Sequence, residues 1–403
     1  MNSKLLHTPV GVRDIYGTEY EQKLLVMDRI HDIFKSYGYS DIQTPTFEFF
    51  DIFNKERGSV ASKNMYKFFD REGNTLVLRP DMTPSIARAA AKYYMDEQFP
   101  MRFCYSGNAF INDSEYQGKL KEFTQVGAEL LGDTTSDADA EVIVMVIESL
   151  IAAGLTEFQI EVGHPEYFKG IVEELNLEEE IVENLTDILE NKKYFGIDTL
   201  VEEANIPENY KEIFLKFQEF DGNVEILDKA LELANNEKSR EAIQRLKKLD
   251  QILQIYGMEK YVSYDLSMLN MYKYYTGVVF RGYTYGTGDA IATGGRYDNL
   301  LKQFGKDFPA IGFAVNVDRL MVAMSRQHLN EKTKEERIMI LYKEENREKA
   351  INYSNELRAV GVKVMLVRKR SVYDIEEYYD FARRSNIHTV VEVTDEITKK
   401  RLD

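Results

Sequence analysis

The 403-residue sequence has few of the residues that mark several protein classes: one cysteine, no tryptophan, five histidines and eight prolines. The single cysteine, Cys104, excludes an internal disulfide, and the scattered histidines lack zinc-binding spacing, so no metal site is predicted. No apolar run approaches the ~20 residues of a membrane helix, and the N-terminus shows no signal-peptide pattern. We therefore expect a cytoplasmic protein that uses no membrane segment, metal or other cofactor.

Positive charge is also scarce. The chain has 51 Lys and Arg against 68 Asp and Glu, a formal net charge of −17. Because nucleic-acid phosphates are bound by clustered cations, this balance argues against nucleic acid as a main partner. Hydrophobic residues make up 44% of the sequence and charged residues 30%, which is typical of a folded globular protein. At about 100–200 residues per domain, the length predicts two or three domains.

Composition and periodicity divide the chain into three parts. Residues 173–250 hold 21 acidic and 10 basic residues, and their apolar residues recur at helical spacing, which predicts an acidic helical insertion. Residues 337–403 have a β-α-β-α-β pattern, a small C-terminal α/β domain that follows a polar linker at 326–336. The remaining core, 1–172 and 251–325, combines long helices with strands joined by short polar turns. We expect an α+β fold, with an antiparallel sheet flanked by helices.

Four segments of this core carry polar side chains that suit ligand binding. The first, TLVLRPDMTPSIAR at 75–88, places Arg79, Asp81 and Thr83 between a strand and a proline-initiated helix. A carboxylate and a hydroxyl at this position can converge on an ammonium group. The alternative is that Asp81 or Thr83 simply caps the helix.

The second segment, KEFTQVGAELLG at 121–132, predicts a strand with Gln125 and Glu129 on one face. In a straight strand these two residues stand about 13–14 Å apart. One small ligand must therefore lie between them, or a bend must bring them together. The alternative is a polar sheet face that is open to solvent.

The other two segments carry arginines. Residues 273–301 contain the turn Gly-Gly-Arg-Tyr-Asp, in which Arg296 either holds an anion or supports Asp298. A tight glycine turn is the simpler alternative. In PAIGFAVNVDRL, residues 309–320, Arg319 falls in the first turn of a predicted helix. A cation there opposes the helix dipole, so Arg319 needs a carboxylate or a bound anion.

Together with TPVGVRDIYG near the N-terminus and SDIQTPTFEFF, these four segments resemble the histidyl-tRNA synthetase family of class II aminoacyl-tRNA synthetases over residues 8–325. Within that superfamily, RPDMTPSIAR and GHPEYFKGI are most similar to a non-catalytic branch, the regulatory subunits of short-form ATP phosphoribosyltransferase. The resemblance implies the class II synthetase-like antiparallel sheet. It also implies a homodimer formed through the first motif, here around Pro45, within a larger hetero-oligomer.

The resemblance also implies a histidine site. The positions that match Asp81, Thr83 and Gln125 surround the α-amino group of histidine in the family, and those that match Glu129 and Tyr275 face the imidazole. A carboxylate and a phenol can hold both imidazole nitrogens at once. A remnant of the phosphate or anion site is expected at three cations: Lys119, Arg296 and Arg319.

The chain departs from a working synthetase at two positions where the family uses arginine, here Ile111 and Asn270. Arginines aimed at the developing phosphate charge stabilise the adenylation transition state, and neither residue can replace them. Asp113 and Glu115 add like charge near any triphosphate.

We therefore predict a non-catalytic subunit that binds the ATP phosphoribosyltransferase catalytic subunit, with histidine as its effector. An active histidyl-tRNA synthetase is the first alternative, favoured by the C-terminal module and by Arg-Lys-Arg at 368–370. A generic amino-acid sensor is the second.

Overall fold

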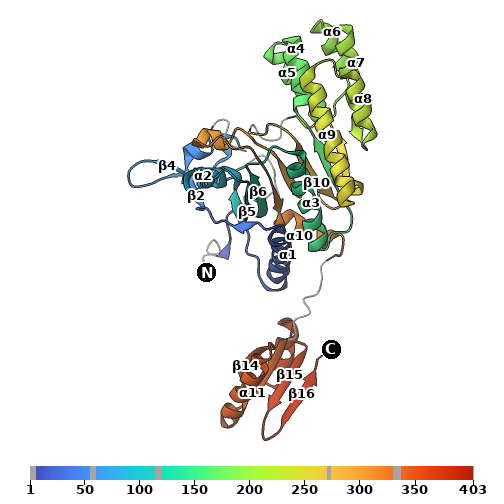
Figure 1. The fold of residues 1–403 in the computed structure, drawn as a ribbon. Helices are drawn as coiled ribbons and strands as arrows, with labels where there is room; N and C mark the ends of the chain where they lie inside the picture. The colour runs from blue at the N-terminus through green and yellow to red at the C-terminus, as the bar shows by residue number, and fades with distance from the viewer. Residues whose placement is uncertain (1–5, 55–59, 114–119, 270–273, 330–336, 403) are drawn as a thin grey trace. The chain divides into compact units, whose positions relative to one another are not determined.

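The protein forms two compact units, residues 1–330 and 331–403, in a computed structural model (Figure 1). The structure describes all residues except 1–5, 55–59, 114–119, 270–273, 330–336 and 403. No helix in the described part is long and apolar enough to cross a membrane.

The first unit is built on a large sheet with nine strands among the described residues, in the order β1-β5-β6-β12-β11-β10-β7-β9-β8. Neighbouring strands run antiparallel, except that β1 is parallel to β5 and β7 is parallel to β9. The predicted α+β architecture is therefore confirmed. The strands are β1 (Ser40–Asp41), β5 (Met101–Phe110), β6 (Glu122–Leu131), β7 (Phe158–Gly163), β8 (Asp221–Gly222), β9 (Val262–Asp265), β10 (Val279–Thr284), β11 (Ala292–Arg296) and β12 (Ala310–Asn316).

Helices flank this sheet and bury its apolar side chains. The sequence predicts a helix from Glu19 to Tyr37 that ends at Gly38. The structure has α1 here, and Gly38 after it has the left-handed φ of 79°. Helix α3 is apolar almost all round and is correspondingly buried in the main core. Its N-terminus is capped by the Thr135 hydroxyl, which accepts the Ala138 N–H at 3.3 Å. The flanking helices are α1 (Gly17–Ser36), α2 (Thr83–Tyr93), α3 (Ser136–Ala153) and α10 (Val317–Arg326).

A small second sheet has the strand order β2-β4-β3. The segment SDIQTPTFEF predicts one strand over residues 40–49. The structure has two short strands there instead, one in each sheet. The break falls at Thr44-Pro45, where proline supplies no N–H for a ladder. The strands are β2 (Phe47–Phe49), β3 (Lys67–Phe69) and β4 (Thr75–Leu78).

A group of helices, coloured green to yellow in Figure 1, follows β7 in the chain. Buried residues of this group, such as Leu185, Phe214 and Leu246, belong to the same hydrophobic cluster as Ile160 of the large sheet. The helical group therefore shares the core of the first unit. The helices are α4 (Glu166–Leu175), α5 (Glu179–Glu190), α6 (Ile197–Glu203), α7 (Glu208–Lys216), α8 (Glu225–Leu233) and α9 (Glu237–Tyr256).

The second unit has a four-stranded sheet in its described residues, in the order β14-β13-β15-β16. The predicted β-α-β-α-β pattern is present, followed by an antiparallel edge strand, β16, that the sequence pattern did not predict. All five residues of β16 are exposed, so it lacks the alternation that marks a half-buried strand. The elements are β13 (Arg337–Tyr342), α11 (Arg347–Ala359), β14 (Lys363–Arg368), α12 (Ile375–Arg384), β15 (Thr389–Val393) and β16 (Ile397–Arg401).

Candidate functional site

The centre of the site is Glu129 on β6, which has no exposed surface. The Thr83 hydroxyl donates to its Oε1 at 2.8 Å, and the Tyr297 hydroxyl donates to its Oε2 at 2.5 Å. Gly312 lies opposite Glu129 on β12, and a Cβ there would stand 1.6 Å from Oε2. Only glycine leaves room for this carboxylate. We call Thr83, Glu129 and Tyr297 the Glu129 cluster.

Burial dominates the electrostatics of this cluster. It raises the pKa of Glu129 to about 8, while the hydrogen bonds from Tyr297 and Thr83 work in the opposite direction. Burial also raises the pKa of the Tyr297 and Tyr105 phenols well above the ordinary value of 10.0, and the nearby Glu129 adds to the effect. At neutral pH both phenols therefore remain protonated, and Glu129 exchanges a proton within the physiological range.

Asp81 and Tyr275 adjoin the Glu129 cluster. Asp81, buried at the start of α2, accepts the Thr83 N–H at 3.3 Å and the Tyr274 hydroxyl at 2.8 Å. The Tyr274 and Tyr275 rings meet edge to face at 5.0 Å, and Tyr275 also packs against Gly295. The structure therefore brings Asp81 and Thr83 to Glu129, whereas the contacts of Tyr275 are with Tyr274 and Gly295. The N-cap residue of α2 is Met82, which makes no side-chain cap, so Asp81 contacts the first N–H of the helix from one residue before the cap position.

A solvent-open cavity of about 430 Å³ adjoins this polar group, and Asp81 and Gln125 form part of its wall. Gln125 lies four residues before Glu129 on β6. Its Oε1 is buried and has no hydrogen-bond partner in the structure. A buried acceptor without a partner costs free energy, which a ligand donating an N–H at this point would recover.

The same cavity is lined by Ile111, Asp113 and Arg319. Arg319 donates to the Ala290 carbonyl at 2.9 Å, and its guanidinium lies 3.7 Å from the Asp289 carboxylate. The carboxylate expected beside Arg319 is therefore Asp289. The Arg319 side chain remains 39% exposed and can still meet an anion from the cavity. Ile111 presents only apolar surface to the cavity.

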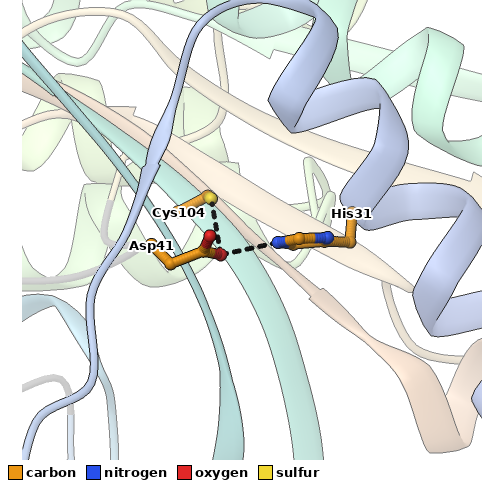
Figure 2. Close-up of side chains that lie close together, drawn as sticks. All are labelled: His31, Asp41 and Cys104. Atoms are coloured by element: carbon orange, nitrogen blue, oxygen red, sulfur yellow. Dashed lines mark hydrogen bonds and ion pairs between the residues drawn. The ribbon is translucent and has the colours of Figure 1, made fainter.

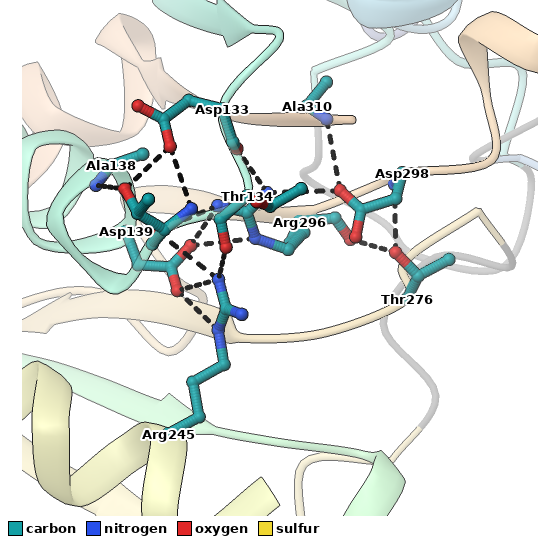
Figure 3. A network of polar contacts seen from close by, with 10 residues as sticks. Asp133, Thr134, Ala138, Asp139, Arg245, Thr276, Arg296, Asp298 and Ala310 are labelled. Atoms are coloured by element: carbon teal, nitrogen blue, oxygen red, sulfur yellow. Dashed lines mark hydrogen bonds and ion pairs between the residues drawn. The ribbon is translucent and has the colours of Figure 1, made fainter. Parts of the chain in front are cut away.

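Arg296 does not face the cavity, and its predicted role in anion binding is wrong. Its side chain is 2% exposed and donates to the Asp139 carboxylate through Nε at 2.9 Å and Nη2 at 2.6 Å (Figure 3). Its Nη1 donates to the Asp133 carbonyl at 2.7 Å and to Asp298 at 3.2 Å. Of the two roles expected for Arg296, anion binding or support of Asp298, its contacts match the second, because it hydrogen-bonds the Asp298 carboxylate.

Asp139 also joins this network to the helical group. Arg245 on α9 donates to the other Asp139 oxygen through Nε at 2.7 Å (Figure 3). Asp139 has no exposed surface, and its carboxylate forms ion pairs with two guanidinium groups, those of Arg245 and Arg296. Because Arg296 directly precedes Tyr297, the network fixes the strand end that presents Tyr297 to Glu129.

Sequence reasoning missed Tyr297 and Tyr274 as partners of the site carboxylates. The sequence did contain a signal for Tyr297. Side chains alternate along a strand, so Tyr297 falls on the same face as Gly295, against which Tyr275 packs. Asp139 and Arg245 are more than 100 residues apart, so only the fold reveals their contact. Three residues predicted to matter near a triphosphate, Glu115, Lys119 and Asn270, lie outside the described residues.

Comparisons with known proteins identify the relatives of this chain. A family model for histidyl-tRNA synthetase matches residues 11–320. The ATP phosphoribosyltransferase regulatory subunit of Acetivibrio thermocellus is 40% identical, over 97% of this chain and 93% of the relative. That of Caldanaerobacter subterraneus is 39% identical, over 95% of this chain and 97% of the relative.

Solved structures give the same result. A crystal structure from Bacillus halodurans, described as an ATP phosphoribosyltransferase regulatory subunit/histidyl-tRNA synthetase, has a TM-score of 0.86 at 33% identity and covers 96% of this chain and 98% of its own. Histidyl-tRNA synthetase from Nostoc has a TM-score of 0.81 at 20% identity, with 98% and 96% covered, and supports the fold alone.

The first unit thus has the body of a histidyl-tRNA synthetase, a class II synthetase-like fold. Within that class, the chain belongs to the family of ATP phosphoribosyltransferase regulatory subunits.

Proposed function

We propose that this chain is the non-catalytic regulatory subunit of a short-form ATP phosphoribosyltransferase, the first enzyme of histidine biosynthesis. It binds the catalytic chain of that enzyme and carries histidine as the effector. One observation carries the proposal: a single cavity is lined by Asp81 and Gln125, which are expected at the amino-acid end of the site, and by Ile111, which replaces an arginine expected at the phosphate end. The names of the relatives support the same role.

Histidine suits the amino-acid end chemically. Its α-ammonium group has a carboxylate at Asp81 and an unpaired acceptor at Gln125 Oε1. We expect the imidazole to point toward Glu129. Glu129 has no exposed surface and its two oxygens already accept the Thr83 and Tyr297 hydroxyls, so the imidazole reaches it only when these side chains open toward the cavity.

Adenylation is disfavoured at the phosphate end. The transition state develops negative charge on the α-phosphate, and loss of one oxyanion-type donor typically costs about 10²–10³ in rate. Ile111 donates no hydrogen bond, and the Asp113 carboxylate on the same cavity wall repels phosphate. We expect the pocket to bind histidine without activating it.

A homodimer through the first-motif region is part of the proposal. On the small sheet, Phe47, Phe49 and Phe68 share one face and are 52%, 55% and 37% exposed. The rings of Phe47 and Phe68 meet edge to face at 5.7 Å. Exposed aromatic clusters of this kind are enriched at protein interfaces, and this one directly follows Pro45.

The decisive experiment mixes the purified chain with the short catalytic chain from the same genome. We expect co-elution at micromolar concentration, and phosphoribosyl transfer that is raised on mixing, made sensitive to histidine, or both. Separate elution with unchanged transfer activity would refute the proposal. Histidine-dependent pyrophosphate exchange within about tenfold of an ordinary synthetase rate would instead establish the alternative, an active histidyl-tRNA synthetase.

The histidine pocket is tested by the Gln125→Leu variant. Loss of one hydrogen-bond partner costs about 1–3 kcal/mol, so histidine affinity should fall by roughly 5–150-fold in calorimetry. Gln303→Leu alters an exposed glutamine outside the cavity and is the matched control, with unchanged affinity. If Gln125→Leu binds histidine as tightly as the wild type, histidine does not use this pocket.

A further inference from the structure

Three side chains of metal-ligating type meet at the edge of the large sheet, and none of them lines the cavity. His31 Nε2 lies 2.6 Å from Asp41 Oδ1, and Cys104 Sγ lies 3.5 Å from the same oxygen (Figure 2). All three ligand atoms fall within 4.8 Å of one another. The scattered histidines and single cysteine gave no sign of this grouping, because its members come from three separate elements.

The arrangement is held by the backbone. β1 and β5 are parallel neighbours, and their register pairs Asp41 directly with Cys104, which puts both side chains on one face of the sheet. His31 projects from α1 toward this pair (Figure 2). One helix and two hydrogen-bonded strands therefore position the three ligands, and a site on such elements is better defined than one on loops.

One of the three ligand distances matches that of a zinc site, and the other two need small shifts. Zinc binds sulfur at about 2.3 Å and nitrogen or oxygen at about 2.0–2.2 Å, so tetrahedral ligand atoms stand about 3.3–3.7 Å apart. The separation of Cys104 Sγ from Asp41 Oδ1 already matches at 3.5 Å. His31 Nε2 lies about 0.7 Å too close to Asp41 Oδ1, and its distance from Cys104 Sγ, within 4.8 Å, must come to about 3.5 Å. The His31 side chain is 44% exposed, so a rotamer adjustment can change both distances.

We propose that His31, Asp41 and Cys104 bind one Zn²⁺ ion, with water in the fourth position. A thiolate and an imidazole together select a borderline-soft metal such as zinc over magnesium or calcium. The negative charges of the Cys104 thiolate and the Asp41 carboxylate neutralise the ion. Zinc would bind Asp41 Oδ1, so Lys35 keeps its ion pair with Asp41 Oδ2 at 3.0 Å. Asp41 is 61% exposed, so the ion enters from solvent, while Cys104 closes the buried side.

The bound ion would have a structural consequence. β1 is the two-residue edge strand of the large sheet, and it precedes the segment that carries Pro45 and the exposed Phe47 and Phe49. Zinc would fasten this edge to α1 and to β5. Since this inference concerns metal binding alone, it does not depend on the proposed regulatory function.

The test uses the full chain, free of any histidine tag and stripped with a chelator. Zinc stoichiometry is measured by competition with a chromogenic chelator, and Co²⁺ serves as the spectroscopic probe. We expect one equivalent of zinc, a thiolate-to-cobalt charge-transfer band and the strong visible bands of tetrahedral cobalt. Absence of the charge-transfer band with saturating Co²⁺ would overturn the proposal.

Variants separate the three ligands from adventitious binding. His31→Ala changes a partly exposed side chain and should weaken zinc binding by more than about tenfold, whereas His388→Ala, in the second unit, should leave it unchanged. Cys104→Ser should abolish the charge-transfer band. Because Cys104 is buried, its variant is checked by circular dichroism, and the His31→Ala result decides the case if it misfolds. Equal affinity of His31→Ala and the wild type would refute the site.

Discussion

Glu129 is the residue whose surroundings most affect the behaviour of the site. Burial raises its pKa from the ordinary 4.5 to about 8, so the folded protein holds a proton that the unfolded chain releases near pH 4.5. The folded state therefore binds more protons than the unfolded state between these two pH values. Through this group, stability is greatest at low pH and declines as the pH rises from about 4.5 to 8.

The first prediction is that Glu129→Gln removes this dependence. Glutamine keeps the shape of the side chain without the titration, so the variant should be more stable than the wild type at pH 8.5 and similar at pH 5. The wild type should lose up to about 1.4 kcal/mol more per pH unit across this window. Urea unfolding at several pH values measures the slopes, and Glu180→Gln, at an exposed position on α5, is the control. Parallel slopes for wild type and Glu129→Gln would contradict the assignment.

Several site residues could be predicted from sequence because a strand or helix start fixes the direction of each side chain. Gln125 and Glu129 follow strand alternation on β6, and Asp81 and Thr83 flank the start of α2. The error at Arg296 has a different origin. A guanidinium group beside two glycines can bind either an anionic ligand or a carboxylate of the same chain. In this structure Arg296 binds the carboxylate of Asp139.

At the scale of elements, one buried carboxylate ties three of them together. Asp139 in the first turn of α3 binds Arg296 at the end of β11 and Arg245 on α9. Removing one member of a buried charge network leaves the others uncompensated, which typically costs about 3–5 kcal/mol. The contact thus joins the helical group to the strand end that bears Tyr297.

The second prediction is that Asp139→Asn destabilises the first unit by about 3–5 kcal/mol in urea unfolding. Lys193→Gln breaks an exposed pair with Asp187 at 3.6 Å, in which both side chains are 65% exposed, and should cost less than about 1 kcal/mol. Comparable losses for the two variants would show that the Asp139 network contributes no more than a surface ion pair.

Elements with strong apolar periodicity were predictable, and those defined by long-range pairing were not. α1 and strands β13, β14 and β15 of the second unit matched their sequence patterns because each packs one apolar face against a core. The two residues of β1 qualify as a strand only because they pair with Phe103 and Cys104, about 60 residues away. β16 likewise depends on pairing with β15 and has no buried face of its own.

At the scale of the whole molecule, the proposed dimer gives the third prediction. Phe49→Asp places a charge among exposed aromatics that an interface would desolvate, so the variant should shift toward monomer in light scattering at micromolar concentration. Phe195→Asp alters a fully exposed phenylalanine elsewhere and should leave the oligomeric state unchanged. A wild type that is monomeric, or a Phe49→Asp variant that still dimerises fully, would exclude this face as the interface.

The last prediction concerns the two compact units, which have separate cores. The clusters of the second unit contain buried residues only from 338 to 402, and the two largest clusters of the first unit contain none of these. Cooperative unfolding follows a shared core, so the full chain should show two calorimetric transitions. Met339→Ala, at a fully buried site in the smaller unit, should lower one midpoint by roughly 10 °C or more and leave the other in place.

Ile147→Ala provides the converse test, since Ile147 is fully buried in the core of the first unit. Ile147→Ala should lower the free energy of unfolding by about 2–5 kcal/mol, as Met339→Ala does. The larger unit has a larger unfolding entropy, so its midpoint temperature should fall by only a few degrees. The smaller unit should keep its own transition. If each substitution moves both transitions together, the units unfold as one cooperative body, and the second unit is stabilised by the first as well as by its own core.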